Sequence, residues 1–423
     1  MSDMESTPAT PSTRPRARFH AMVKPGGAKC NLDCAYCFYL HKQELFAQPQ
    51  RPRMTDEVLE LHIRQYIEAQ TGDQVVFSWQ GGEPTLLGLD FFRRVVALQA
   101  RYRKPGQEVA NDLQTNGTLL DPEWAGFLKQ HGFLVGLSVD GPAQLHDRFR
   151  TTRGGRGTHA AVVAAARLLR QHGVPFNALC VVNRENARRP LDVYRYLTRE
   201  LGARRIQLIP CVEPADFRTM SPQRWVAEAM PIVGSPGARP GTPESVVTDW
   251  SVDPEDWGRF LCKVWDDWYG RDYGKVHVDL FETAVAQSLG LPAQRCVTAE
   301  FCGKALAIEH DGEVFSCDHF VYPEYRLGNI RNHHWRDLAF STTQRAFGFA
   351  KRDTLPPDCR NCSFLKLCWG ECPKNRFVRT ADGTPGLNYL CPGLKLFFAH
   401  IARDMPEILE RVQGQSSRSW LAT

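Results

Sequence analysis

The sequence predicts an α/β protein, with a partial (β/α)6 TIM-like barrel followed by a cysteine-rich C-terminal domain. Strand and helix patterns alternate with short connections through the first half of the 423 residues. Such alternation implies a parallel sheet with right-handed crossovers, and five or six units are too few for a closed eight-stranded barrel. Most of the fourteen cysteines fall into three groups. We therefore expect the chemistry at the C-terminal ends of the strands, with a metal-stabilised domain behind them.

Five short apolar runs, separated by helical patterns, are predicted to be buried strands. These runs are QVVFSW (Gln74–Trp79), VANDLQT (Val109–Thr115), FLVGLSV (Phe133–Val139), FNALCVV (Phe176–Val182) and RIQLIP (Arg205–Pro210). The barrel prediction depends on their order along the chain.

The helices between these strands are predicted from apolar residues at helical spacing and from their end signals. Thr55 is a suitable N-cap for the first, and Asp56 and Glu57 suit the positive end of its dipole. Pro190 is suited to the first turn of a later helix. Further helices are expected over 89–103, over 158–173 with Gly173 after its last turn, and after Cys391.

The predicted organisation has five parts. Residues 1–17 are a disordered lead-in, and 18–232 form the partial barrel. Residues 233–250 are a loop or linker, because Gly and Pro interrupt the pattern there. Residues 251–400 form the cysteine-rich domain, and 401–423 form a C-terminal helix and tail.

The composition, 43% hydrophobic and 23% charged residues, is typical of a globular protein. No apolar run approaches the ~20 residues that a membrane span needs. The N-terminal stretch MSDMESTPATPSTRPRARFH lacks the apolar core of a secretory signal, so we expect a cytoplasmic protein. The net charge of +5 argues for neither a nucleic acid nor a membrane as partner.

Clustered cysteines in a reducing compartment indicate metal or redox chemistry, because structural disulfides are disfavoured there. The first group is Cys30, Cys34 and Cys37; the second is Cys296, Cys302 and Cys317; the third is Cys359, Cys362, Cys368, Cys372 and Cys391. These numbers fit one three-cysteine site and two four-cysteine sites. Of the remaining cysteines, Cys180 lies in FNALCVV and is expected to be a buried small hydrophobe.

The stretch CNLDCAYCFY presents three thiolates and no nearby fourth ligand. Asn31 and Asp33 favour a loop there, although the spacing also fits one helix face. A four-iron cluster held by three cysteines leaves one iron free for a substrate, whereas a structural zinc needs four ligands. The alternative is a zinc site completed by a distant histidine.

CNLDCAYC, with Tyr36 before its last cysteine, resembles the signature of radical S-adenosylmethionine (SAM) enzymes, in which the free iron chelates SAM. Other segments resemble family motifs in the same order: GGEP (Gly81–Pro84), QTNGTLL (Gln114–Leu120), SVDGP (Ser138–Pro142), HDRFR (His146–Arg150) and IQLIPCVE (Ile206–Glu213). The resemblance implies SAM as a cofactor. It places Tyr36, Gly82, Glu83, Ser138, Arg150 and Cys211 at the cofactor.

Each of these segments also has an ordinary structural interpretation. GGEP could be a tight turn, Ser138 could end a strand, and Arg150 could be a solvated charge. Glycines at a strand end would equally let a ligand approach the backbone. The order of the segments after successive strands favours the functional interpretation.

The last two cysteine groups resemble the SPASM domain, which carries two auxiliary [4Fe-4S] clusters. The pattern is C-x5-C-x14-C, then C-x2-C-x5-C-x3-C, then x18 and a last cysteine. By resemblance, Cys296, Cys302, Cys317 and Cys372 hold one cluster, and Cys359, Cys362, Cys368 and Cys391 hold the other. Spacing alone does not fix this partition, and a zinc ribbon over 359–372 is the alternative. With the SAM-binding cluster, the resemblance implies three [4Fe-4S] clusters.

In CDHF, Asp318 directly follows Cys317, as does the catalytic base of the anaerobic sulfatase-maturating enzymes. The alternative is an aspartate in a polar loop. The resemblance spans about residues 19–399. It implies a radical SAM oxidoreductase that oxidises a Cys or Ser of a sulfatase polypeptide to 3-oxoalanine (formylglycine) through a 5′-deoxyadenosyl radical. Asp318 is then the base, and the auxiliary clusters accept electrons.

The resemblance also implies binding partners, and two other functions are alternatives to this one. The partners are an unfolded or nascent sulfatase polypeptide and an electron donor such as flavodoxin or ferredoxin. Gln80 and Tyr39 resemble positions near the peptide. The closest rival is a radical SAM/SPASM enzyme that forms thioether or carbon–carbon crosslinks in a small peptide. A non-catalytic zinc-binding module is the rival from another class.

Overall fold

The computed structural model describes residues 18–420, with side chains described to residue 412. Its centre is a ten-stranded sheet in the order β10-β9-β8-β1-β2-β3-β4-β5-β6-β7. Neighbouring strands from β8 to β7 are parallel, and β9 and β10 are antiparallel. The strands are β1 His20–Lys24, β2 Gln74–Trp79, β3 Glu108–Thr115, β4 Leu134–Ser138, β5 Phe176–Val182, β6 Arg205–Pro210, β7 His277–Val278, β8 Ala305–Glu309, β9 Glu313–Phe315 and β10 Arg326–Asn329.

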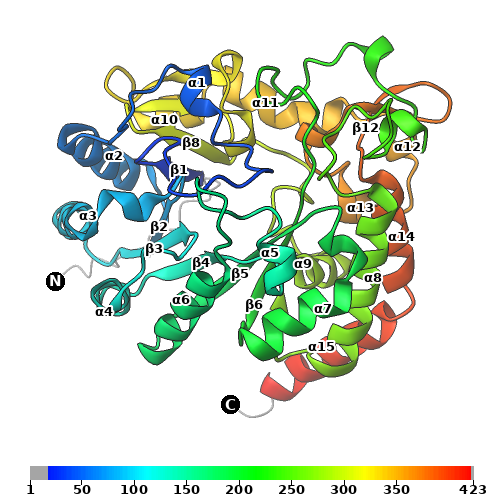
Figure 1. Ribbon diagram of the computed structural model, residues 1–423, viewed down its shortest axis with the longest axis horizontal. Helices are drawn as coiled ribbons and strands as arrows, with labels where there is room; N and C mark the ends of the chain where they lie inside the picture. Colours follow the sequence, from blue (N-terminus) through cyan, green and yellow to red (C-terminus); the bar gives the residue numbers. More distant parts are fainter. Residues whose placement is uncertain (1–17, 421–423) are drawn as a thin grey trace, which may run out of the picture.

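One main helix follows each strand from β1 to β6, and these helices form an arc outside the sheet (Figure 1). They are α2 Asp56–Ala69, α3 Leu89–Tyr102, α4 Pro122–Gln130, α6 His159–Gln171, α7 Pro190–Arg195 and α8 Pro254–Arg271. The predicted partial (β/α)6 barrel is therefore confirmed.

The five predicted strands are all present, whereas β1 and β7 to β10 were missed. The residues predicted to begin and end helices also occupy those positions. The Thr55 hydroxyl accepts a hydrogen bond from the Val58 amide at 3.3 Å, and Pro190 is the first residue of α7. Gly173 follows α6 with φ of 66°.

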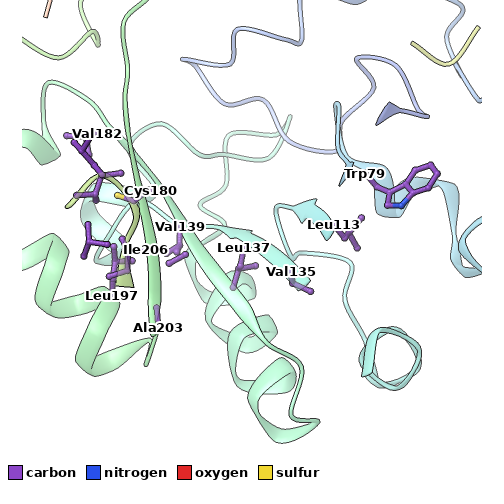
Figure 2. Packing of buried hydrophobic residues seen from close by; sticks show 14 of the residues in the cluster. Trp79, Leu113, Val135, Leu137, Val139, Cys180, Val182, Leu197, Ala203 and Ile206 are labelled. Atoms are coloured by element: carbon purple, nitrogen blue, oxygen red, sulfur yellow. The ribbon is translucent and has the colours of Figure 1, made fainter. Parts of the chain in front are cut away.

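The barrel core lies between the sheet and the helices. Trp79, Leu113 and Val135 are adjacent in register on β2, β3 and β4, and all three are fully buried. Figure 2 shows these side chains with their neighbours on β4 to β6. The alternate residues, such as Ser78 and Asp112, line a cavity of about 360 Å³ inside the barrel. The alternation thus separates an apolar core from a polar interior.

The C-terminal cysteine-rich region is joined to the barrel by strand pairing, since β8 extends the sheet beside β1. Its elements are α9 Asp279–Ser288, α10 Trp335–Ala339, α11 Thr342–Asp353, α12 Pro357–Arg360, α13 Leu365–Cys368, α14 Cys391–Ile401, α15 Met405–Trp420, and a hairpin of β11 Val378–Arg379 and β12 Pro385–Leu387. Two short helices, α1 Lys42–Leu45 and α5 Ala143–His146, follow β1 and β4.

The domain boundaries stay predictions. The lead-in at 1–17 lies outside the described residues, and 233–250 contains only a 3₁₀ turn at Pro236–Ala238 besides bends and bridges. Helix α8, predicted in the C-terminal domain, contacts both α7 of the barrel and α14. Within residues 18–420, none of the helices has the length and apolar character of a bilayer span.

We predict that Gly393→Ala destabilises the protein. A Cβ at Gly393 of α14 would lie 1.9 Å from the Pro254 carbonyl oxygen of α8. Relief of such overpacking costs about 1–3 kcal/mol. The thermal unfolding midpoint should therefore fall. Iron binding should weaken with it, because α14 begins at Cys391.

The matched control is Gly270→Ala in α8, where a Cβ would meet nothing within 4 Å. Alanine is favoured over glycine in a helix by roughly 0.5–1 kcal/mol, so this midpoint should stay or rise. Equal midpoints for the two variants would contradict the close packing of α8 on α14.

Candidate active site

The first three cysteines lie on a loop that follows β1, as the sequence predicted. Residues 30–38 of this loop are in turns and irregular structure. Two neighbouring segments bind the loop through its backbone. The Gly82 and Glu83 amides donate to the Gly27 and Lys29 carbonyls at 2.9 and 2.8 Å. The Asp33 amide donates to the Thr151 carbonyl at 2.9 Å. The loop is thus fixed from both sides by backbone hydrogen bonds.

GGEP has a structural role in fixing the cysteine loop. A Cβ at Gly82 would lie 1.9 Å from the Lys29 carbonyl oxygen, so only glycine permits this approach. Buried Glu83 accepts hydrogen bonds from the Asn116 amide at 2.8 Å and the Thr115 hydroxyl at 2.8 Å. Glu83 therefore ties the end of β2 to the end of β3. The cofactor contacts predicted for Gly82 and Glu83 stay predictions.

A second buried cluster joins Tyr36 to the later motifs. The Tyr36 hydroxyl donates to the Asp140 carboxylate, and the Arg150 Nε lies 3.2 Å from the same oxygen. The other Asp140 oxygen accepts from the Val181 amide at 3.0 Å. Asp140 is fully buried, so Arg150 is its neutralising partner and is not a solvated charge. Asp140 was not singled out from the sequence, although it lies within the SVDGP motif.

Ser138 and Cys211, the remaining residues placed at the cofactor by resemblance, are both buried. Ser138 is the last residue of β4, and Cys211 directly follows β6. Both therefore lie at the C-terminal rim of the barrel, with the cysteine loop. Their contacts with a cofactor stay predictions.

The donor set of the cysteine loop fits an iron–sulfur cluster. All the cysteines are free, and Cys34 and Cys37 line a cavity of about 630 Å³. No three of the described His, Cys, Asp and Glu side chains are close enough to hold one metal ion. A cluster, in contrast, takes thiolates spaced around its corners. Burial raises the pKa of Cys30 and of Cys37 to about 11, so these thiols would have to lose their protons to hold a cluster.

The C-terminal cysteines line two cavities. Cys359, Cys362, Cys368 and Cys391 line one, and Cys296, Cys317 and Cys372 line the barrel cavity, which Cys368 lines as well. The pKa of Cys372 is raised by burial, by Glu371 and by Cys302, so Cys302 lies near it. The partition that the resemblance implies stays a prediction. Cys180 is buried on β5, and Cys262 is buried on α8.

A left-handed turn separates Cys368 from Cys372. Trp369, Gly370 and Glu371 have φ of 48°, 66° and 49°. Such backbone is costly for residues other than glycine and needs support. Arg376 provides it, because its guanidinium donates to the Trp369 carbonyl at 2.8 Å and the Gly370 carbonyl at 3.0 Å. After this turn both cysteines line the barrel cavity, but only Cys368 also lines the second cavity.

Asp318 lies in the barrel cavity and has an ionic partner, Lys24, that was not predicted from the sequence. The Lys24 ammonium, at the end of β1, pairs with the Asp318 carboxylate. Burial raises the pKa of Asp318, but Lys24, His319 and Lys42 outweigh it and lower the pKa overall. Lys24 is itself buried, 4.4 Å from the centroid of the Tyr39 ring. A lysine ending an apolar run before Pro25 was the only signal for this contact.

Gln80 lines the same cavity as Asp318, whereas Tyr39 does not line it. The Tyr39 hydroxyl donates to the buried Glu309 carboxylate. The ring of His319, the residue after Asp318, stacks on Phe38 with centroids 5.1 Å apart. The cavity therefore presents acidic, basic and polar side chains together with apolar ones, a combination typical of a ligand site.

Comparison with protein families agrees with this geometry. Residues 25–197 match the radical SAM superfamily, and residues 296–363 match an iron–sulfur cluster-binding domain, SPASM. The fold and the cysteine loop therefore define a radical SAM enzyme with a C-terminal iron–sulfur domain.

Individual relatives identify which family of this superfamily the chain resembles. A serine-type anaerobic sulfatase-maturating enzyme of Bacteroides thetaiotaomicron is 42% identical, over 98% of this chain and 96% of the relative. A cysteine-type enzyme of Clostridium perfringens is 32% identical, over 90% and 95%. A solved structure, native anSMEcpe with bound AdoMet and Cp18Cys peptide, has a TM-score of 0.79 at 30% identity, covering 94% of this chain and 100% of that one. The chain belongs to the family of anaerobic sulfatase-maturating enzymes.

We predict that Arg150→Met lowers both stability and iron content. The substitution leaves Asp140 buried without its cation, which typically costs about 3–5 kcal/mol. Tyr36 binds the same carboxylate, so the cysteine loop should loosen. Asp140→Asn added to Arg150→Met should recover part of the thermal midpoint, because it removes the unpaired charge.

The control is Arg93→Met, which breaks exposed ion pairs with Asp90 and Glu123 on the outer helices α3 and α4. It should cost under about 1 kcal/mol. Thermal unfolding and iron assays of anaerobically prepared protein provide the comparison. If Arg150→Met kept the wild-type midpoint, the buried pair would not stabilise the loop.

Proposed function

We propose that this enzyme oxidises a serine or cysteine side chain of an unfolded sulfatase polypeptide to formylglycine. The observation that carries the proposal is the buried Asp318, paired with Lys24 and adjacent to Cys317 in the barrel cavity. The names of the relatives support the same activity. We keep the cytoplasm as the expected location.

The cofactors are assigned to the residues as follows. Cys30, Cys34 and Cys37 would hold the SAM-binding cluster. SAM would be contacted by Tyr36, Gly82, Glu83, Ser138, Arg150 and Cys211. The eight C-terminal cysteines would hold two auxiliary clusters, which accept electrons, so that the total is three. When bound, SAM and the reduced cluster supply a carbon-centred radical that removes one hydrogen atom from the substrate.

Asp318 is proposed to remove the proton of the target hydroxyl or thiol. A base must be ionised and within hydrogen-bond reach of that proton. The lowered pKa of Asp318 keeps the carboxylate charged, and Lys24 fixes its position. Loss of a Cβ hydrogen atom, this proton and one further electron converts a serine to the aldehyde. A cysteine gives the thioaldehyde, which water then hydrolyses.

The comparisons favour serine as the target. The three relatives named serine-type are 35–42% identical, whereas those named cysteine-type are 30–32% identical. The cavity contains no described feature that distinguishes the two side chains, so an assay with matched peptides decides between them.

We predict aldehyde formation on a serine-containing sulfatase peptide of C/S-x-P-x-R type, and its loss in Asp318→Asn. General-base catalysis contributes about 10²–10⁴-fold, so the rate should fall by that factor while SAM cleavage persists. Mass spectrometry of peptides that differ only in serine or cysteine measures both the product and the preference. Glu244→Gln, at an exposed residue of the 233–250 loop that does not line the barrel cavity, is the control.

Three outcomes would contradict the assignment. Undiminished aldehyde formation by Asp318→Asn would remove Asp318 as the base. A crosslinked product, or a loss of two hydrogens without an aldehyde, would support the peptide-crosslinking rival. Colourless protein containing only zinc would exclude this chemistry.

We also predict about twelve irons per chain, four for each of three clusters. Cys302→Ala should lower the iron content by up to four and leave the signals of the other clusters unchanged in electron paramagnetic resonance. Cys180→Ala is the control, since Cys180 is buried in the barrel core. Equal iron losses for Cys180→Ala and Cys302→Ala would contradict the ligand assignment.

A further inference from the structure

Two buried cations, Lys351 and Arg376, lie close to the C-terminal cysteines. Neither forms an ion pair among the residues whose side chains are described. The lysine and arginine that line the barrel cavity, in contrast, have carboxylate partners, which pair Lys374 with Glu213 and Arg295 with Asp279. A buried cation without a counter-ion is costly. We therefore expect an anion beside Lys351 and Arg376.

The proposed ligation divides the neighbouring cysteines into two sets, each of which would hold one auxiliary cluster. A cluster bound by four thiolates is an anion, and its net charge is one of the factors that set its reduction potential. We call Cys296, Cys302, Cys317 and Cys372 the inner set, and Cys359, Cys362, Cys368 and Cys391 the outer set.

Lys351 lies against the inner set because its helix, α11, packs on the segment that contains Cys302. The Cys302 amide donates to the Gly348 carbonyl at 3.1 Å, and a Cβ at Gly348 would lie 2.8 Å from the Cys302 carbonyl oxygen. Three residues further along α11, the Lys351 ammonium donates to the carbonyls of Cys296 and Val297 at 2.6 and 2.8 Å. Its charge is thus fixed by the backbone of an inner cysteine.

Arg376 lies between α11 and the outer set. Its guanidinium donates to the Lys351 carbonyl at 2.6 Å, in addition to the two carbonyls of the left-handed turn. It also packs on Gly370, where a Cβ would lie 2.7 Å from the Arg376 Nη2. Gly370 lines the cavity of the outer cysteines. The guanidinium is therefore next to the wall of that cavity.

The cysteines that act on each cation agree with these positions. Burial lowers the pKa of both cations, and inner cysteines raise the pKa of Lys351 whereas cysteines of both sets raise that of Arg376. Glu371 is the carboxylate near the inner set, and the side-chain amides of Asn375 and Asn388 donate to it at 3.1 and 2.8 Å. Two cations thus lie beside the inner set with one carboxylate.

We propose that Lys351 and Arg376 are the counter-cations of the auxiliary clusters and raise their reduction potentials, Lys351 for the inner cluster and Arg376 for both. The inference rests on the proposed ligation of two [4Fe-4S] clusters by these cysteines. Reduction adds one electron to a cluster, and no bond forms or breaks. The added negative charge is stabilised by a nearby buried cation, so the reduced form gains more than the oxidised form. Both side chains are positioning residues for the electron-accepting role.

The test measures the reduction potentials of the cluster-loaded, full-length enzyme. Lys351→Met removes the charge and keeps an unbranched side chain, whereas Lys351→Arg keeps the charge. Arg352→Met is the matched control, because Arg352 is the next residue of α11, is exposed and pairs with Glu300 and Asp353. Anaerobic titration with dithionite, followed by electron paramagnetic resonance, gives the midpoint potential of each cluster. The signal that is missing from Cys302→Ala identifies the inner cluster.

Lys351→Met should lower the potential of the inner cluster by about 59 mV or more, which is a tenfold change in the equilibrium constant of a one-electron couple. The same constant for the other clusters should stay within about twofold of wild type. Lys351→Arg and Arg352→Met should also stay within about twofold, because the first keeps the buried charge and the second removes only a charge that solvent and salt screen.

Arg376 needs two variants because it also supports the left-handed turn. Arg376→Met and Arg376→Lys both lose the guanidinium contacts with the turn, but only Arg376→Met loses the charge. Arg376→Met should lower the potentials of both auxiliary clusters by about 59 mV or more relative to Arg376→Lys. Iron analysis shows whether both clusters are retained. If Arg376→Met loses a cluster, the Lys351 variants still decide the question for the inner cluster.

An unchanged potential of the inner cluster in iron-replete Lys351→Met would overturn the inference. Equal shifts in Lys351→Met and Lys351→Arg would assign the effect to packing, and an equal shift in Arg352→Met would assign it to net charge. The titration needs no peptide, so a failure of the formylglycine proposal leaves it intact. A failure of the proposed ligation is distinguishable, because the chain would then lack the iron of the auxiliary clusters.

Discussion

The parallel pairing of β1 with β8 is the constraint on which the site depends. Its register runs from His20 opposite Ala305 to Lys24 opposite Glu309. Because β1 leads into the first cysteine loop and β9 returns antiparallel along β8 before Cys317, this one strand pair places Asp318 within reach of Lys24. The entropic cost of closing a loop grows slowly with its length, so the intervening barrel does not prevent the pairing.

The sequence predicts those parts of the fold that local patterns determine. Five strands are buried apolar runs, and Thr55 and Pro190 act as ordinary helix signals. β1 escapes this reasoning because HAMVK is short and has His20 and Lys24 at its ends. Lys24 is polar for a reason that lies outside the strand, namely the Asp318 carboxylate. Departures from local pattern are expected at functional sites, and β1 is such a case.

The partition of the cysteines could not be read from their spacing, because it depends on backbone conformation. Three consecutive left-handed residues lie between Cys368 and Cys372, and Cys368 lines both cavities whereas Cys372 lines only the barrel cavity. Two of those residues, Trp369 and Glu371, are not glycine, so the sequence gives no turn signal beyond Gly370. Nothing in the sequence indicates that Arg376 supports the turn through the carbonyls. The partition that the family resemblance implies therefore stays a prediction.

The cysteine loop also separates two cavities. Cys37 lines the cavity that carries Arg153 and Arg218, whereas the next residue, Phe38, lines the cavity that contains Asp318. A buried ion pair such as Lys24–Asp318 is weak evidence for stability, because desolvation offsets most of its attraction. The retention of this pair, in a cavity that also contains Asp112 and Lys374, is better explained by the chemistry proposed for that cavity than by stability.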